Sequence, residues 1–200
     1  MAARANGEQA SWAEAYALLA QTLLEAPRRN EPALYDAAIW ETFPCGESFD
    51  EVGNAVASVV MACPADDDGL RAVSADYTHL FVGPPKPASM PWQTMHANPN
   101  ATSLSGTPTA EVRRTLNELG LQRDEENGQL EDHIGNILMV AAVMAQRGLH
   151  EQRREFVSAH VLSWIDDLSF SVEANSSTDF YPAILALAKA VAEADAASSL

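Results

Sequence analysis

The sequence predicts an all-α protein, a helical bundle interrupted by one proline-rich segment. Apolar residues recur at helical spacing through most of the 200 residues, and no stretch alternates apolar and polar residues as a strand does. A composition of 47% hydrophobic and 20% charged residues is that of an ordinary globular chain. No repeat or linker divides the chain, so we expect a single domain over residues 1–200, with its core at about residues 9–195.

The first predicted helix carries four large apolar side chains on one face: Trp12, Tyr16, Leu19 and Leu23. Pro27 ends this helix, because proline lacks the amide hydrogen that a helix interior uses. Leu34 and Ile39 indicate a short second helix that stops near Pro44. We therefore expect two helices before the third apolar stripe begins.

Two more helices precede the proline-rich segment. The third ends before Pro64, and its apolar stripe consists of Phe49, Val52, Val56, Val59 and Val60. The stripe of the fourth consists of Leu70, Val73, Tyr77, Leu80 and Phe81. This last stripe runs directly into an irregular segment expected at about residues 83–106.

The remaining helices follow that segment. Thr107 is predicted to be an N-cap with Pro108 at the first helical position, and Gly120 is predicted to close the same helix. The next helix is expected to stop near Gly148, and its stripe consists of Leu130, Ile134, Ile137, Leu138 and Ala141. Two final stripes comprise Val157, Val161, Trp164, Ile165 and Leu168, and then Phe180, Ile184, Leu187, Ala188 and Val191.

Charge and composition exclude several classes of function. A net charge of −16 disfavours nucleic acid and anionic membranes, because both need clustered Lys and Arg. The longest apolar run, residues 137–145, is too short to span a bilayer, which needs about 20 residues. The N-terminus lacks an apolar signal core, so we expect a cytoplasmic protein. Cys45 and Cys63 lack CxxC spacing, which favours idle thiols over a disulfide or a metal site.

The sequence also lacks the motifs of common enzymes. It contains no phosphate-binding loop, no GxGxxG, no GxSxG and no HExxH, since Arg154 stands where the second histidine would be. The five histidines have no metal-ligand spacing with one another. We therefore expect no bound metal, no cofactor and no catalytic residue, although a dispersed active site stays open as an alternative.

The proline-rich stretch "YTHLFVGPPKPASMPWQTMH", residues 77–96, is unusually apolar for a loop. One interpretation is a surface loop whose aromatic residues fold back over the core. The other is a rigid apolar wall in which Trp92, Met90 and Met95 stay half-exposed for a peptide, because proline limits the entropy of ordering.

Asp132 and His133 form the second candidate site. We expect Asp132 in the first turn of a helix, where the helix dipole favours a carboxylate. His133 lies one turn from Leu130 and Ile137, at the edge of the apolar stripe. It is either a satisfied core histidine or, beside a carboxylate, part of a recognition patch.

Five stretches together resemble the TorD/DmsD family of molybdoenzyme maturation chaperones. In chain order they are "YTHLFVGP", "MPWQT", "TPTAEVRRTLNELGL", "QLEDHIGNILMVAAVMAQRG" and "FVSAHVLSWIDDLSFSVEANSSTDFYPAILALA". The resemblance covers roughly residues 70–195, and the Glu-Asp-His-Ile-Gly stretch is nearest the dimethyl-sulfoxide-reductase branch. Met90 and the pair Gln129-Leu130 depart from the family's usual residues.

The resemblance implies an all-helical bundle of the TorD/DmsD type that acts as a cytoplasmic chaperone. Such a protein binds the twin-arginine signal peptide of a molybdopterin oxidoreductase catalytic subunit and delays export until the cofactor is inserted. It is a monomer or a domain-swapped dimer. The signal-peptide residues that the resemblance implies are Leu80, Phe81, Gly83, Pro84, Pro91, Trp92, Asp132 and His133, with Tyr16 as a weaker transfer.

In this interpretation, the apolar wall buries the apolar stretch of the leader and acidic groups such as Asp132 bind its arginines. Two alternatives stay open. One is a nitrate-reductase-type assembly chaperone for a non-exported subunit, which would bind a terminal peptide without the two arginines. The other is a nucleotide-dependent helical enzyme.

Overall fold

The computed structural model describes residues 2–27, 32–44, 49–98, 103–122 and 128–198. In these ranges it contains ten α-helices. In chain order they are α1 (Ala2–Leu24), α2 (Ala37–Glu41), α3 (Asp50–Ala62), α4 (Asp67–Tyr77), α5 (Gln93–Ala97), α6 (Thr107–Glu118), α7 (Ile134–Gln146), α8 (His150–Val157), α9 (Ile165–Asn175) and α10 (Phe180–Ala197). The described ranges also contain three short turns of other helix types. They are the 3₁₀ turn η1 (Pro32–Tyr35), which is tighter than an α-helix, and the wider π-helical turns η2 (Thr78–Val82) and η3 (Ser158–Leu162).

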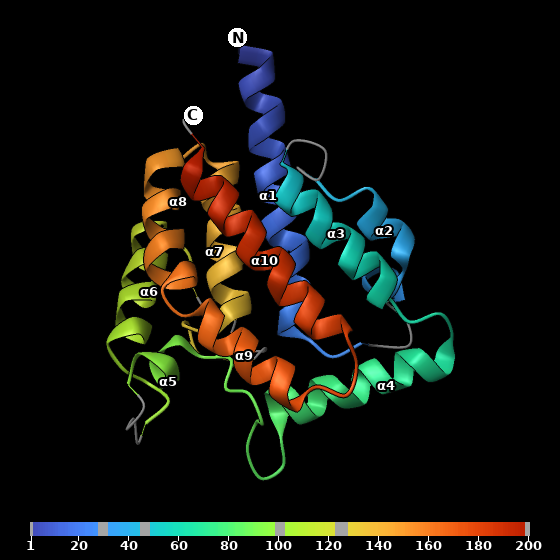
Figure 1. Ribbon diagram of the computed structural model, residues 1–200. Helices are drawn as coiled ribbons and strands as arrows, with labels where there is room; N and C mark the ends of the chain where they lie inside the picture. Colours follow the sequence, from blue (N-terminus) through green and yellow to red (C-terminus); the bar gives the residue numbers. More distant parts are fainter. Residues whose placement is uncertain (1, 28–31, 45–48, 99–102, 123–127, 199–200) are drawn as a thin grey trace.

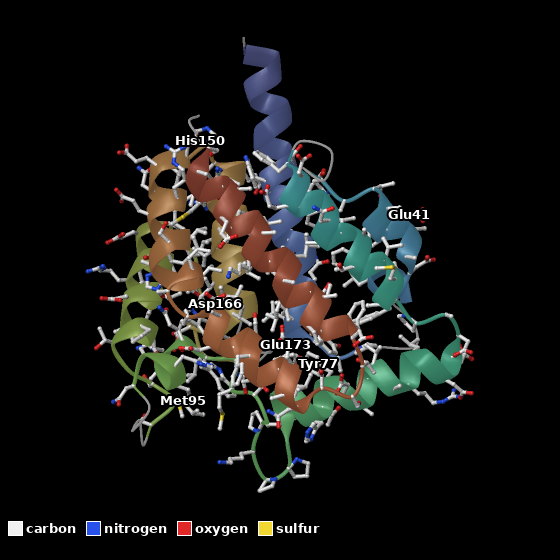
Figure 2. All side chains as sticks on the ribbon, viewed as in Figure 1. Glu41, Tyr77, Met95, His150, Asp166 and Glu173 are labelled. Atoms are coloured by element: carbon white, nitrogen blue, oxygen red, sulfur yellow. The ribbon has the colours of Figure 1, made fainter. Side chains whose placement is uncertain are left out.

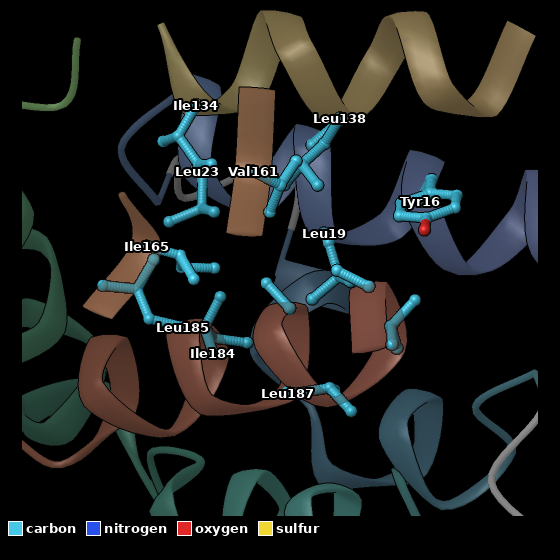
Figure 3. Close-up of a cluster of buried hydrophobic side chains, with 14 of the residues drawn as sticks. Tyr16, Leu19, Leu23, Ile134, Leu138, Val161, Ile165, Ile184, Leu185 and Leu187 are labelled. Atoms are coloured by element: carbon cyan, nitrogen blue, oxygen red, sulfur yellow. The ribbon is translucent and has the colours of Figure 1, made fainter. Parts of the chain in front are cut away.

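The bundle is organised around α1, which packs along α7, while α10 lies alongside α3 on the face shown in Figure 1. Helices α5, α6 and α8 lie on one side of this centre, and α4 lies across one end (Figure 1). One continuous apolar core joins these elements, and Figure 3 shows part of it, with Leu19 of α1 directed toward the α10 ribbon that carries Ile184, Leu185 and Leu187. Burial of this core supplies the main driving force for folding.

The all-α prediction is confirmed, since the described residues contain no strand, only an isolated bridge between Trp92 and His133. Pro27, Pro44 and Pro64 all follow the helices they were expected to end. Gly120 and Gly148 lie just after α6 and α7, as expected of residues that close helices. Their φ angles of 65° and 70° are the left-handed conformation typical of that position.

Three expectations about element boundaries were wrong. The predicted N-cap Thr107 is the first residue of α6, because Gly106 takes the extended N-cap conformation. Leu130 lies outside α7, which begins only at Ile134. The stripe from residue 157 to 168 is divided between α8, η3 and α9. The segment expected to be irregular at about 83–106 is interrupted only by the short helix α5 in its described part. Its residues 99–102 lie outside the described ranges, as does Cys45.

Candidate functional site

Two π-helical turns position the proline-rich segment. In η2, the wider turn leaves carbonyl groups free for other donors: Ala88 N donates to the His79 carbonyl at 3.1 Å, and Ser89 N donates to the Leu80 carbonyl at 2.9 Å. The loop after η2 therefore folds back onto the turn that it leaves. Isolated π-helical turns occur frequently at functional sites, because they interrupt the regular hydrogen-bond ladder.

The second π turn, η3, holds the other end of the segment through Gln93. The Gln93 Nε2 group donates to the Ala159 carbonyl at 2.9 Å and to Ser163 Oγ at 3.2 Å. Its Oε1 atom therefore accepts from His160 Nδ1, at 2.8 Å. Burial lowers the pKa of His160, so its ring is neutral at neutral pH and carries its hydrogen on Nδ1.

Residues 91–94 also pair with the turn that precedes α7. Trp92 and His133 form an antiparallel bridge, and Gln93 N donates to the Asp132 carbonyl at 3.0 Å. The two motifs that the sequence singled out separately, around residues 92 and 132, are thus one structural unit. We call Trp92, Asp132 and His133 the bridge cluster.

Asp132 is fully buried but poorly satisfied. Its Oδ2 atom accepts one hydrogen bond, from Thr94 N at 2.9 Å, while Oδ1 has no partner in the described part of the chain. The expectation that Asp132 lies in the first helical turn was wrong, because it precedes the N-cap residue His133. Its carboxylate supports the 91–94 loop instead of the helix dipole.

His133 begins α7 by capping it with a ring nitrogen. Nδ1 accepts from Gly135 N at 3.1 Å, so the hydrogen of the neutral ring is on Nε2. Complete burial lowers the pKa of His133 from 6.5 to about 3, which keeps the ring neutral at physiological pH. Its Nε2–H group is buried without a hydrogen-bond partner in the described residues.

Trp92 is 8% exposed, which excludes the half-exposed Trp92 of the second interpretation of this segment, whereas Met90 and Met95 are half-buried. The Trp92 ring meets the His133 ring edge-on, with the two ring centroids 5.9 Å apart. Backbone pairing with residues 132–134 holds the Trp92 side chain against the bundle. Its Nε1–H group, like His133 Nε2, has no partner among the described residues. The bridge cluster therefore contains two unused donors and one unused acceptor, whereas buried polar groups are normally paired.

Leu80 and Phe81 belong to the core. Phe81 meets the rings of Tyr77 and Tyr181 edge-on at 5.3 and 5.4 Å. Its side chain is 3% exposed, and Leu80 is fully buried. These two residues hold η2 against the bundle, so any contact with a peptide would require movement around them.

Gly83 and Pro84 form the turn that leaves η2. Gly83 has a φ of 89°, and a Cβ there would lie 2.5 Å from the carbonyl carbon of Lys86, so only glycine fits. Pro84 is exposed, and the peptide bond from Pro84 to Pro85 is cis. Pro91 is buried, and its carbonyl accepts from Ile134 N at 2.9 Å.

Tyr16 does not join the bridge cluster. It is fully buried on α1, and its hydroxyl donates to Asp195 Oδ2 at 2.8 Å. Figure 3 shows Tyr16 apart from Ile134, the first residue after the bridge cluster. Asp195 also takes a bidentate pair from Arg153, at 2.8 and 2.6 Å. The position of Tyr16 therefore indicates a structural role.

The known proteins to which this chain is similar belong to the family that its sequence motifs resemble. The profile of the family described as nitrate reductase delta subunit matches residues 47–169. The Tat proofreading chaperone DmsD of Salmonella paratyphi A is 27% identical over 113 residues, 56% of this chain and 55% of that protein. The probable Tat proofreading chaperone DmsD of Haemophilus influenzae is 27% identical over 122 residues, 60% of this chain and 59% of that protein.

Chaperone protein TorD of Photobacterium profundum is 26% identical over 146 residues, 66% of this chain and 65% of that protein. This chain belongs to the TorD/DmsD family. The match spans about half the length of the first relatives, 55% for the Salmonella protein. All three relatives are named as chaperones, which supports the expectation that this family member is not an enzyme.

Sequence reasoning missed the polar residues that support the family motifs, namely Gln93, Thr94, His160 and Glu131. Glu131 is 5% exposed and forms a bidentate pair with Arg113 of α6, at 2.7 and 3.1 Å. This pair fixes the turn that carries Asp132. Both residues stand inside quoted motifs, Val-Arg and Glu-Asp-His, and that was the available signal.

Within the described ranges, no three His, Cys, Asp or Glu side chains are placed to share a metal ion. None of the described helices is both long and apolar enough to cross a membrane.

Proposed function

We propose that this protein is a cytoplasmic redox-enzyme maturation chaperone. It binds the twin-arginine signal peptide of a molybdopterin oxidoreductase catalytic subunit, of the dimethyl-sulfoxide-reductase type, and delays export until the cofactor is inserted. Family membership and the names of the relatives support this function. The structural observation that carries it is the bridge cluster, where three buried polar atoms lack partners in the described structure.

The chemistry of these atoms suits a peptide backbone. Trp92 Nε1 and His133 Nε2 are donors that fit peptide carbonyls, and Asp132 Oδ1 is an acceptor that fits a peptide N–H or a guanidinium group. An unpaired buried polar group costs roughly 1–3 kcal/mol, so a peptide that pairs with these atoms recovers that free energy on binding. In the free protein the described residues leave these three atoms unpaired, and the bound peptide supplies their partners.

The leader reaches the bridge cluster by displacing the half-buried methionines of the loop. Met90 and Met95 flank Trp92, and Met95 lies at the outer edge of the bundle on α5 (Figure 2). Methionine side chains adapt to varied apolar partners, which suits leaders whose apolar stretches differ. The net charge of −16 attracts the cationic leader, and this attraction should weaken as salt concentration rises.

The test is calorimetric titration with leader peptides of the same organism's molybdoenzymes, each paired with an Arg-Arg to Ala-Ala control. Binding of one leader at micromolar or lower Kd, weakened in its control, is the expected result. Absence of binding to every leader would refute the proposal. Binding that is equal for the control would leave only a groove for apolar peptides.

A variant of Trp92 tests the bridge cluster itself. Trp92→Phe removes the Nε1–H donor and keeps an aromatic ring, whereas Trp92→Ala would also cost roughly 3–5 kcal/mol of core packing. We expect leader affinity to fall about threefold to tenfold, as for one lost hydrogen bond. Trp12→Phe, the same substitution at a 5% exposed position on α1, is the matched control and should leave affinity unchanged.

A second candidate is a nitrate-reductase-type assembly chaperone for a non-exported subunit. The description of the matching family profile, nitrate reductase delta subunit, favours it. Such a protein would bind a terminal peptide that has no arginine pair. Titration with terminal peptides of non-exported molybdoenzyme subunits separates the two functions.

A further inference from the structure

Two adjoining grooves meet at Tyr35, away from the bridge cluster. The first has a volume of about 530 Å³ and an apolar wall formed by Leu18, Leu24, Leu34 and Ile39. The second has a volume of about 480 Å³, and three of its lining residues are acidic: Asp36, Asp66 and Asp67. Each volume falls in the range typical of ligand pockets, about 300–1,000 Å³. We call the pair the Tyr35 groove.

The acidic half of the groove carries three exposed carboxylates that no side chain of the described ranges neutralises. Asp36 and Asp66 are exposed N-caps of α2 and α4, and each accepts one backbone hydrogen bond, at 2.9 and 2.8 Å. Asp67 is also exposed, and in the described ranges no cationic side chain pairs with any of the three. The pKa of the Cys63 thiol in this half is raised to about 11, by burial and then by the charge of Asp36.

The apolar half adjoins the helix junction that carries the bridge cluster. Leu24 lines the groove and packs against Gly135, where a Cβ would lie 2.5 Å from Leu24 Cγ and 3.1 Å from the Ala20 carbonyl oxygen. Gly135 N donates in turn to His133 Nδ1. The wall of the groove and the bridge cluster therefore share one helix-to-helix contact.

We infer that the Tyr35 groove binds the basic and apolar stretch of the leader, with its arginines at Asp36, Asp66 and Asp67 and its apolar side chains against Leu24, Leu34 and Ile39. This inference rests on the proposed function. Charge complementarity selects this occupant, because an apolar wall beside three exposed carboxylates matches a segment with cations beside apolar residues. In this arrangement the bridge cluster forms hydrogen bonds with the leader backbone, and the Tyr35 groove contacts the leader's side chains.

The deciding experiment removes the three charges without removing the helix caps. In the variant Asp36→Asn/Asp66→Asn/Asp67→Asn, asparagine caps helices about as well as aspartate. The probe is a synthetic 20-residue peptide with Arg-Arg followed by leucines and alanines, compared with its Ala-Ala counterpart. A control triple, Glu151→Gln/Asp167→Asn/Glu173→Gln, changes the net charge equally at exposed positions on α8 and α9 (Figure 2 labels Glu173).

We expect the groove triple to weaken the Arg-Arg peptide about tenfold and the control triple less than twofold, since exposed ion pairs are worth up to about 1 kcal/mol each. The Ala-Ala peptide should not distinguish the two triples. Equal weakening by both triples would show only long-range attraction and would overturn the inference. Full affinity in the groove triple would overturn it while leaving the proposed function intact, whereas a wild-type protein that binds no leader refutes both.

The apolar half has its own test. Leu34→Gln should weaken the Arg-Arg and Ala-Ala peptides alike, by about fivefold, because it removes apolar contact and leaves the charges. Photo-crosslinking with a benzophenone placed three residues after the arginines is independent of stability. Crosslinks to residues 34–39 support the inference, and crosslinks confined to Met90 and Met95 overturn it.

Discussion

Two buried carboxylates, Asp195 on α10 and Asp132 before α7, differ sharply in how the described chain satisfies them. Asp195 is fully buried and accepts three hydrogen bonds, two from Arg153 and one from Tyr16. Asp132 is equally buried, yet it accepts one hydrogen bond and has no cationic partner among the described residues. Both oxygens of Asp195 are paired, and we call Asp195 with Tyr16 and Arg153 the closed unit, although Arg153 Nη1 has no partner among the described residues. The Asp132 carboxylate, in contrast, has one unpaired oxygen in the described structure.

A third buried carboxylate shows that the closed arrangement is the ordinary one here. Asp76, which is 1% exposed, accepts four hydrogen bonds from the backbone and hydroxyl groups of Ser177 and Thr178, and so fixes the turn before α10. Asp195 and Asp76 thus each have hydrogen-bond donors for both carboxylate oxygens. The incomplete shell of Asp132 supports the proposal that this carboxylate contacts the leader, since binding sites often trade stability for function.

The comparison predicts its largest effect at Asp195. Asp195→Ala leaves the Arg153 guanidinium buried without its carboxylate, and loss of one partner of a buried pair costs roughly 3–5 kcal/mol. Urea unfolding followed by circular dichroism measures this loss. The double variant Arg153→Leu/Asp195→Leu should recover much of it, and a single variant of near wild-type stability would show that the pair contributes little.

Substitution of Asp132 should change the stability little and the leader affinity strongly, unlike substitution of Asp195. Asp132→Asn keeps an oxygen for Thr94 N and removes the unpaired charge, so the free energy of unfolding should change by less than about 1 kcal/mol. Leader affinity should fall about tenfold, because a charge-assisted contact is lost. Unfolding and calorimetry on the same preparation decide this. A stability loss as large as that of Asp195→Ala would make Asp132 structural and remove the contrast.

Much of this contrast lay beyond sequence reasoning. Apolar spacing located the main helices, because the 3.6-residue period directly reflects which face is buried. The pairing of Tyr16 with Asp195 joins residues 179 positions apart, which no local period reports. The one signal was an acid on an apolar stripe, since Asp195 follows Val191 at i+4 on α10.

The candidate site was predicted in part. The motifs around Trp92 and Asp132 were identified separately from their residue types, and their pairing was not, because one bridge and a few long-range hydrogen bonds create it. The burial of Trp92 has the same origin. Leu130 was assigned to a helix because its spacing to Ile134 fits, but His133 caps α7 after it and ends that register.

His133 sharpens the comparison through pH. Its pKa is about 3 in the folded protein against 6.5 for an ordinary histidine, so between these values the unfolded chain binds a proton that the native state does not. The free energy of unfolding should therefore fall as pH falls below 6.5, by up to about 1.4 kcal/mol per pH unit. His133→Asn keeps an acceptor for Gly135 N and cannot titrate. From pH 6.5 to 5.0 it should lose roughly 1–2 kcal/mol less than wild type.

The same ring predicts that leader affinity is independent of pH between 6 and 8, since His133 stays neutral throughout this range. Unfolding curves at several pH values, run in parallel on both proteins, provide the stability measurement. Equal slopes for the two proteins would mean that His133 is charged in the native state, and its Nε2–H would then not be the neutral donor described above.

The smallest effect tests the weakest transfer from the family motif, Tyr16. Tyr16→Phe removes one of three hydrogen bonds to Asp195, while the bidentate pair from Arg153 remains, so we expect a loss of roughly 0.5–1.5 kcal/mol in the free energy of unfolding. Leader affinity should stay within twofold of wild type, because Tyr16 lies in the closed unit and not in the bridge cluster. If affinity falls while stability is kept, Tyr16 contacts the leader. The α1 end of the bundle would then belong to the binding surface, and full satisfaction of a carboxylate would no longer separate structural from functional groups in this protein.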